Sequence, residues 1–133
     1  MYSSNPLLCA TYLINDNVRN VAGEDLGKIE DIVINVETGQ IQYAILSFGG
    51  FMGIGNRHFA LPWELLGVEW LEKHIIILDV DKELLKNAPK FNKDNPPNFE
   101  DPQFKSEIYE YYNLSIKHEV TTNHKKHSYG AGL

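Results

Sequence analysis

The spacing of the apolar runs is the strongest constraint on this chain. From Val18 to Val80, short stretches rich in β-branched and aromatic residues alternate with turn residues, a pattern typical of a β-meander or small barrel. Glu72 and Lys73 leave only a two-residue connection between the last two runs. Parallel strands need a long crossover, so these runs must pair antiparallel. We expect an all-β fold, a small β-barrel of about five to six mostly antiparallel strands with short C-terminal helices.

A tight hairpin is the clearest local feature. Gly39, within Glu37-Thr-Gly-Gln, takes a positive φ at no steric cost and therefore suits a hairpin turn. The run before it carries apolar residues at both odd and even positions, so neither face of the strand is purely apolar. This pattern predicts a long, bent strand whose two ends contribute to different packing layers. The run after it is apolar on both faces, which predicts a strand covered from both sides. The expected strands are Leu26–Val36, Ile41–Phe48, Arg57–Leu61, Gly67–Leu71 and His74–Val80, with a candidate short strand around Val18.

Two short helices follow the strands. Asp81 suits the N-cap of a helix from Lys82 to Asn87, which Pro89 ends. Asp101 and Pro102 suit the N-cap and the first position of a second helix. The apolar stripe of this helix favours docking on the barrel over binding a partner. The stripe consists of Phe104, Ile108, Tyr111 and Tyr112.

The chain therefore divides into three parts. Residues 1–89 are the predicted barrel domain. Residues 90–113 comprise a linker rich in Asn, Asp and Pro and the second helix, which packs on the barrel. Residues 114–133 have no apolar period and are expected to be a disordered tail.

Charge and composition limit the partners. Twelve Lys plus Arg stand against eighteen Asp plus Glu, a formal net charge of −6, which repels phosphate backbones and makes nucleic acid a poor candidate. No apolar run reaches the length of a transmembrane segment, and the N-terminus lacks the pattern of a secretory signal. The single cysteine, Cys9, fits a reducing compartment. We expect a cytoplasmic protein.

No catalytic or metal-binding motif is recognisable. Cys9 lies near the terminus, and no serine occupies a Gly-x-Ser-x-Gly turn. The chain has no cysteine pair, no His-Glu-x-x-His and no calcium-loop pattern. Histidines of the tail lack a rigid surrounding that would make a specific metal site. We expect no enzymatic activity, no cofactor and no metal.

Asp31 is the carboxylate with the most unusual predicted position. Its phase in the strand places it on the same face as Ile29 and Val33, and therefore inward. A buried carboxylate satisfied by backbone amides is favoured over a functional acid. The alternative is a small-ligand-binding protein or an enzyme, with a pocket at the barrel mouth near Asp31, Arg57 and His58.

The segment from Gly49 to Gly55 places three large apolar residues among four glycines. It lacks the Lys and the Ser or Thr of a P-loop, and no helix follows it, which argues against a nucleotide site. If Phe51, Met52 and Ile54 are exposed, they form a contact patch. If they fold inward, they plug the end of the barrel. The sequence leaves both alternatives open.

Three blocks of sequence resemble the PRC-barrel domain family. They are GEDLGKIEDIVINV from Gly23, FGGFMGIGNRHFALPW from Phe48 and DVDKELLKNAPKFNKDN from Asp79. The chain looks like the stand-alone bacterial members, similar to the cytoplasmic domain of the photosynthetic reaction centre H subunit. The resemblance implies a small, often self-associating β-barrel without established catalysis. It also implies structural turn or barrel roles for Gly23, Gly27, Asp31, Gly39, Pro62 and Trp63.

These observations favour a non-catalytic binding or assembly module. We expect it to self-associate or to dock on a protein partner. The candidate contacts are the loop that carries Phe51, Met52 and Ile54, the apolar stripe of the C-terminal helix, or both.

Overall fold

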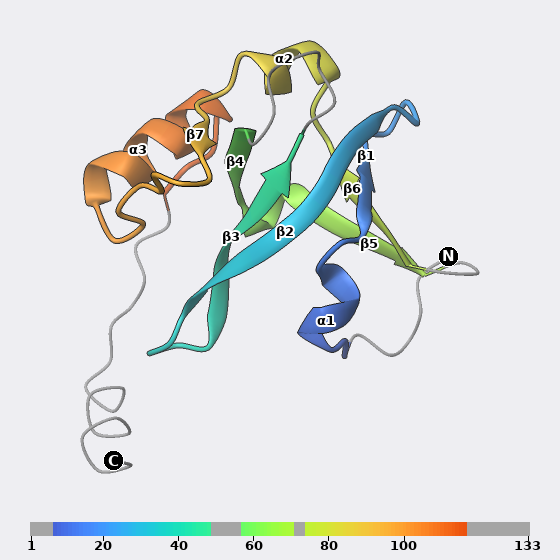
Figure 1. Cartoon of the computed structure of the whole chain (residues 1–133), viewed down its shortest axis with the longest axis horizontal. Helices are drawn as coiled ribbons and strands as arrows, with labels where there is room; N and C mark the ends of the chain where they lie inside the picture. Colours follow the sequence, from blue (N-terminus) through green and yellow to red (C-terminus); the bar gives the residue numbers. More distant parts are fainter. Residues whose placement is uncertain (1–6, 49–56, 71–73, 117–133) are drawn as a thin grey trace.

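One curled sheet of seven strands forms the body of the molecule (Figure 1). The structure is a computed structural model that describes residues 7–48, 57–70 and 74–116. The strand order is β5-β6-β1-β2-β3-β4-β7, and the sheet curls into a half-barrel. The strands are β1 (Asn17–Arg19), β2 (Asp25–Asn35), β3 (Gln40–Ser47), β4 (Arg57–Pro62), β5 (Leu66–Trp70), β6 (His74–Leu78) and β7 (Phe91–Asn92).

The predicted all-β barrel architecture is confirmed, with two differences in detail. β7 lies inside the segment predicted as a linker, because Phe91 and Asn92 pair with the edge of β4. β1 pairs in parallel with β6 although every other pair is antiparallel. This pairing joins segments almost sixty residues apart, so the many strands between them serve as the crossover that a parallel pair requires.

Within the described ranges, four helical segments accompany the sheet. Both predicted N-caps are present: the Asp81 carboxylate accepts from Leu84 N–H at 2.7 Å, and the Asp101 carboxylate accepts from Gln103 N–H at 2.9 Å. The first helical segment was not predicted, because Cys9 at its N-cap makes no side-chain capping bond. The segments are α1 (Ala10–Leu13), the 3-10 turn η1 (Trp63–Leu65), α2 (Lys82–Lys86) and α3 (Pro102–Tyr111).

β2 bends because its ladders are irregular. Against β3, Ile29 pairs with Leu46 and Asp31 pairs with Ile45, which leaves Glu30 as an extra residue on β2. Such a bulge bends the strand and increases its twist. This confirms the predicted long, bent strand.

Gly27 brings β2 unusually close to β3. Its φ is +113°, and a Cβ at this position would lie 2.2 Å from the carbonyl oxygen of Ser47. Only glycine tolerates both this backbone conformation and this approach. Gly39 also has a positive φ, 77°, at the turn between β2 and β3, so the predicted hairpin is confirmed.

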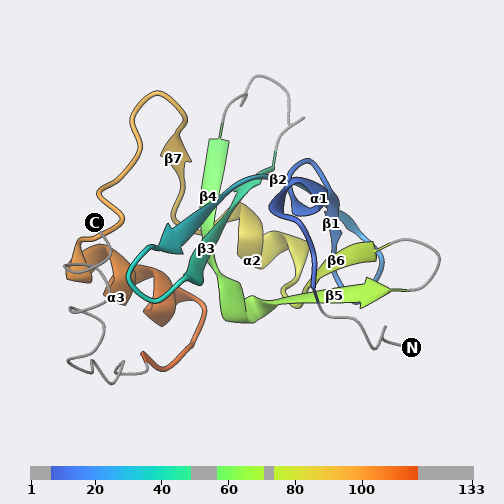
Figure 2. The ribbon, with the colours of Figure 1, turned by 90° about the horizontal axis from the view of Figure 1, so that it is seen from below.

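β3 and β4 are covered on both faces, as predicted for β3. Side chains of directly paired residues share a face of the sheet, so the pairs Leu46 with Phe59 and Ala44 with Leu61 face the barrel interior. The opposite face of the same two strands is covered by α3 and the segment before it, where Phe99 and Phe104 pack on Tyr43. Figure 2 shows α3 and β7 on one side of β4 and the β5–β6 hairpin on the other.

The inward position predicted for Asp31 is wrong. Asp31 is exposed, and its carboxylate accepts a hydrogen bond from the N–H of its neighbour Ile32 at 2.8 Å. The bulge at Glu30 is the physical reason, because an extra residue breaks the alternation that would place Asp31 on the face of Ile29.

Replacing Gly27 with alanine should strongly destabilise the fold. We expect Gly27→Ala to lower the free energy of unfolding by at least about 2 kcal/mol, because the Cβ meets backbone and the φ is strained. Gly67→Ala is the matched control, because a Cβ there meets nothing within 4 Å. It should change stability by less than about 1 kcal/mol. Urea unfolding measures both, and equal losses would contradict this role for Gly27.

Candidate functional site

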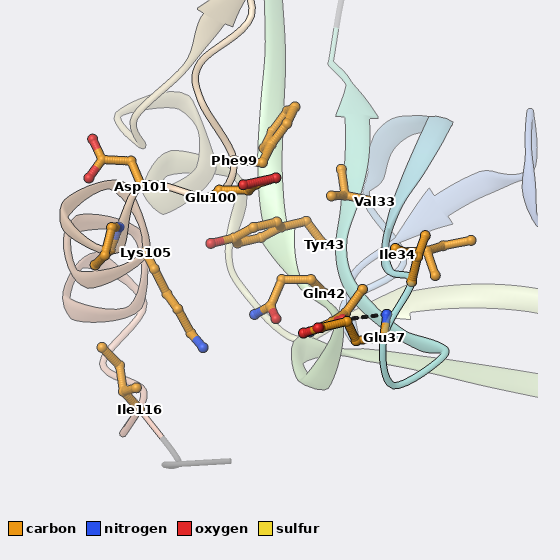
Figure 3. A pocket seen from close by; sticks show the side chains of 13 residues that line it. Val33, Ile34, Glu37, Gln42, Tyr43, Phe99, Glu100, Asp101, Lys105 and Ile116 are labelled. Carbon is orange, nitrogen blue, oxygen red and sulfur yellow. Dashed lines mark hydrogen bonds between the residues drawn. The ribbon is translucent and has the colours of Figure 1, made fainter. Parts of the chain in front are cut away.

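A cleft of about 700 Å³ lies between the β2–β3 hairpin and helix α3. We call it the hairpin cleft. In Figure 3, Ile34 and Glu37 line one side, Lys105 and Ile116 line the other, and Tyr43 lies between them. The lining residues are Val33, Ile34, Asn35, Val36, Glu37, Gln42, Tyr43, Phe99, Glu100, Asp101, Pro102, Lys105 and Ile116.

Aromatic contacts hold the two walls together. The ring of Tyr43 on β3 lies 6.0 Å from the ring of Phe99 and 5.8 Å from that of Phe104, between centroids. Phe99 and Phe104 are themselves 5.9 Å apart in an edge-to-face arrangement, a geometry that aromatic pairs prefer. Phe91 of β7 continues the cluster, packing against Phe99 on one side and stacking on His58 on the other.

A polar contact adds to this packing. The side-chain amide of Gln42 donates to the hydroxyl of Tyr109 at 3.1 Å, which links β3 to α3. Burial, followed by the nearby Glu64 carboxylate, raises the pKa of Tyr109 well above its usual range. Lys105 lies over the Tyr109 ring, with its ammonium 5.5 Å from the centroid. The side of α3 nearest to the sheet is therefore fixed.

The rim of the hairpin cleft is acidic. The charged residues that line it are Glu37, Glu100, Asp101 and Lys105, and Lys105 is engaged with the Tyr109 ring. Within the described part of the chain, no ion pair involves Glu37 or Glu100. The cleft therefore presents carboxylates without a compensating cation at its mouth.

Apolar side chains are exposed beside these carboxylates. Val36 is 74% exposed and Ile34 is 47% exposed, both at the end of the hairpin. Ile116, on the opposite wall, is 39% exposed. Exposed apolar groups that gather in one place, bordered by polar groups, are typical of interaction sites.

Residues of the predicted apolar stripe on α3 face inward. Ile108 and Tyr112 are buried within the core of this chain, and Phe104 packs on Tyr43. The hydroxyl of Tyr111 donates to the carbonyl of Leu84, which ties α3 to α2. This is the arrangement expected for a helix docked on the barrel.

Arg57 and His58, predicted to lie at a pocket, are not among the residues that line the hairpin cleft. Phe51, Met52 and Ile54 lie outside the described residues. Arg57 is exposed whereas its neighbour His58 is buried, because consecutive residues of a strand point to opposite faces.

The pocket envisaged near Asp31, Arg57 and His58 does not coincide with the hairpin cleft, whose lining includes none of the three. Asp31 lies on β2 and is separated from β4 by β3, a span of roughly 10 Å. Asp31 is also exposed and bonded to the N–H of Ile32. The described structure therefore does not bring these three side chains together at one pocket.

The residues assigned structural roles lie at turns or in the sheet. Gly23 has a φ of 86° in the turn between β1 and β2. Pro62 is buried at the end of β4, where it pairs with Tyr43, and Trp63 begins η1 with its side chain partly buried. None of these residues lines the hairpin cleft.

Sequence reasoning missed Ile34 and Val36 as site residues. Both were assigned to a strand whose two ends contribute to different packing layers. The local sequence pattern does not show which end of such a strand is buried and which is exposed to solvent. Their position immediately before the Glu37-Thr-Gly-Gln turn was the available signal, because hairpin ends often project beyond the layer that covers the sheet.

The described residues contain no cluster that could hold a metal ion and no helix that could span a membrane. Across residues 7–48, 57–70 and 74–116, no three His, Cys, Asp or Glu side chains gather as a metal site would need. No helix in these ranges is long and apolar enough to cross a bilayer.

Comparison with known proteins identifies one family. The model of the PRC-barrel domain matches residues 10–85, more than half of the chain. No match was found among curated proteins. The matched region includes strands β1 to β6 and the hairpin wall of the cleft, whereas α3 and Ile116 lie beyond it.

Tyr43 provides a test of the aromatic cluster through pH. Its hydroxyl is buried without a hydrogen-bond partner among the described residues, and burial raises its pKa to about 12. An unfolded tyrosine ionises near pH 10. The stability that this group contributes is therefore present below pH 10 and lost as the pH rises from about 10 to about 12.

We expect Tyr43→Phe to be at least as stable as the wild type at pH 8, because it removes an unpaired buried hydroxyl. Between pH 8 and about pH 12 it should lose less stability than the wild type, by about 1–3 kcal/mol. Tyr109→Phe is the control and should cost about 1 kcal/mol at pH 8, because Gln42 loses its partner. Urea unfolding at both pH values gives these differences. Parallel pH dependences for wild type and Tyr43→Phe would contradict the prediction.

Proposed function

The chain belongs to the PRC-barrel family, and on this premise we propose that it is a non-catalytic binding module that self-associates or docks on a protein partner. The proposed contact surface is the hairpin cleft together with the end of the β2–β3 hairpin. PRC-barrel domains are typically modules of protein interaction or assembly and are generally non-catalytic. The family supports the general role, and the particular surface is our inference.

The exposure of Val36 and Ile34 beside the cleft is the observation that carries this proposal. The β2–β3 hairpin buries the side chains of Leu26, Ile29 and Tyr43 in the core. At the end of the same hairpin, however, the apolar side chains of Ile34 and Val36 are exposed to solvent. Covering them with a partner would remove apolar surface from water, a gain of about 25 cal/mol per Å². The carboxylates of Glu37 and Glu100 would then form the polar rim.

The loop that carries Phe51, Met52 and Ile54 is a second proposed contact. It follows β3 at the end opposite to the Gly39 turn, and β3 has eight residues, which span roughly 25 Å. The point where the loop leaves β3 is therefore far enough from the Gly39 turn for the two proposed contacts to be tested by separate variants.

Removing the apolar groups at the hairpin end should abolish association without unfolding the protein. We expect the double variant Ile34→Ser/Val36→Ser to lose the concentration-dependent sedimentation of the wild type, or to bind a purified protein partner at least about tenfold more weakly. Val21→Ser is the matched control, because Val21 is 75% exposed but lies in the turn between β1 and β2. It should behave as the wild type does.

Thermal unfolding checks that all variants remain folded. The partner is obtained by capture from native lysate, identified by mass spectrometry and then measured in purified form. If association survives in the double variant but is lost from Phe51→Ser/Met52→Ser/Ile54→Ser, the contact belongs to the loop. If neither variant changes it, the proposed surfaces are wrong.

A further inference from the structure

The hairpin cleft has an occupant within reach in the same chain. Ile116 forms part of its wall, and residues 117–133 follow Ile116 directly in the sequence. We propose that this C-terminal segment docks in the hairpin cleft, with its lysines paired to the carboxylates of the rim. The inference goes beyond the proposed function and does not rest on it, since it concerns a contact within one chain.

Charge complementarity is the first argument. Residues 117–133 contain three lysines, Lys117, Lys125 and Lys126, against the single carboxylate of Glu119, a formal charge of +2. The whole chain carries −6, so the preceding 116 residues carry −8. A basic segment is thus joined to an acidic body, and Ile116, which precedes the segment, lines the same cleft as the acidic rim.

The rim offers these lysines unpaired carboxylates. Glu37 and Glu100 line the cleft from its two walls and form no ion pair with any described residue. Among the described residues that line the cleft, Lys105 is the only cation, and its ammonium lies over the ring of Tyr109. A lysine from outside therefore meets carboxylates whose charge is not neutralised by a described cation, and an exposed ion pair with them adds a modest attraction.

Reach and tethering supply the second argument. Lys125 is nine residues beyond Ile116, a distance of up to roughly 30 Å along the chain. Since Ile116 itself lines the cleft, Lys125 and Lys126 can reach either wall. A short tether also holds a segment at an effective concentration in the millimolar range. An intrinsic dissociation constant of about 1 mM is therefore enough to keep a large fraction of the segment docked.

Apolar groups supply the third argument. The cleft exposes Ile34, Val36 and Ile116, and the segment brings Val120 and Tyr129 on either side of its paired lysines. Covering the exposed hairpin end with these side chains would remove apolar surface from water. The docked segment would then compete with any protein that binds at the same place.

Paramagnetic relaxation in the full-length chain tests the contact. The variant Cys9→Ser/Ser128→Cys carries a single nitroxide label next to Tyr129, and Cys9 is an exposed residue whose side chain makes no capping bond. At low ionic strength, the backbone amides of Ile34 and Val36 should lose most of their signal intensity. The amide of Val21 should not, because it lies beyond the other end of β2, an eleven-residue strand that spans over about 30 Å.

Charge reversal separates docking from random encounter. Adding Lys125→Glu/Lys126→Glu to the labelled chain should restore the intensity at Ile34 and Val36, as should about 1 M salt, which screens charges beyond about 3 Å. Lys28→Glu/Lys93→Glu is the matched control, because it changes the net charge equally at exposed residues that do not line the cleft. It should leave the broadening unchanged.

Three results would overturn the proposal. One is full intensity at Ile34 and Val36 in the labelled chain. Another is broadening that persists after Lys125→Glu/Lys126→Glu, because the lysine pairing would then be absent. The third is broadening that arises only when labelled, isotope-free protein is mixed with unlabelled, isotope-enriched protein, because the segment would then come from a second copy. None of these results bears on whether a partner binds the hairpin end.

Discussion

The bend of β2 is the constraint on which the rest of the structure depends. β2 lies at the centre of the sheet between β1 and β3, and the extra residue at Glu30 together with the close approach of Gly27 to Ser47 forces it to curl. The first half of the strand can therefore place Leu26 and Ile29 in the core. The second half leaves that layer and carries Ile34 out into solvent. The core and the bare hairpin end are thus two consequences of one bent strand.

The hairpin cleft exists because an aromatic cluster covers the outer face of the sheet only in part. Tyr43 contacts both Phe99 and Phe104, which anchors the start of α3 over the middle of β3. The helix then passes beside the hairpin end without covering it. The family match ends at residue 85, so this wall of the cleft is built by residues that follow the matched domain. One wall of the cleft therefore lies outside the matched domain.

The candidate site was the part that the sequence predicted least well. Asp31 was expected to point inward by strict alternation, but one bulged residue was enough to place it in solvent. Such bulges depend on how two strands fit together, which no local pattern records. Ile34 and Val36 were equally invisible, because their exposure depends on where α3 stops covering the sheet. Arg57 and His58 were expected beside one pocket, whereas consecutive strand residues point to opposite faces, and Arg57 is exposed while His58 is buried.

The sequence by itself determined the local elements. Turn glycines, N-cap aspartates and runs of β-branched residues act through backbone preferences over a few residues, so the Gly39 turn, the Asp81 and Asp101 caps and the antiparallel β5–β6 pair were all predicted correctly. Only the tertiary structure decided the parallel pairing of β1 with β6, the recruitment of Phe91 to the edge of β4, and the cleft beside α3. These features join residues far apart in the chain. They follow from the packing of completed elements against one another, which local residue preferences do not encode.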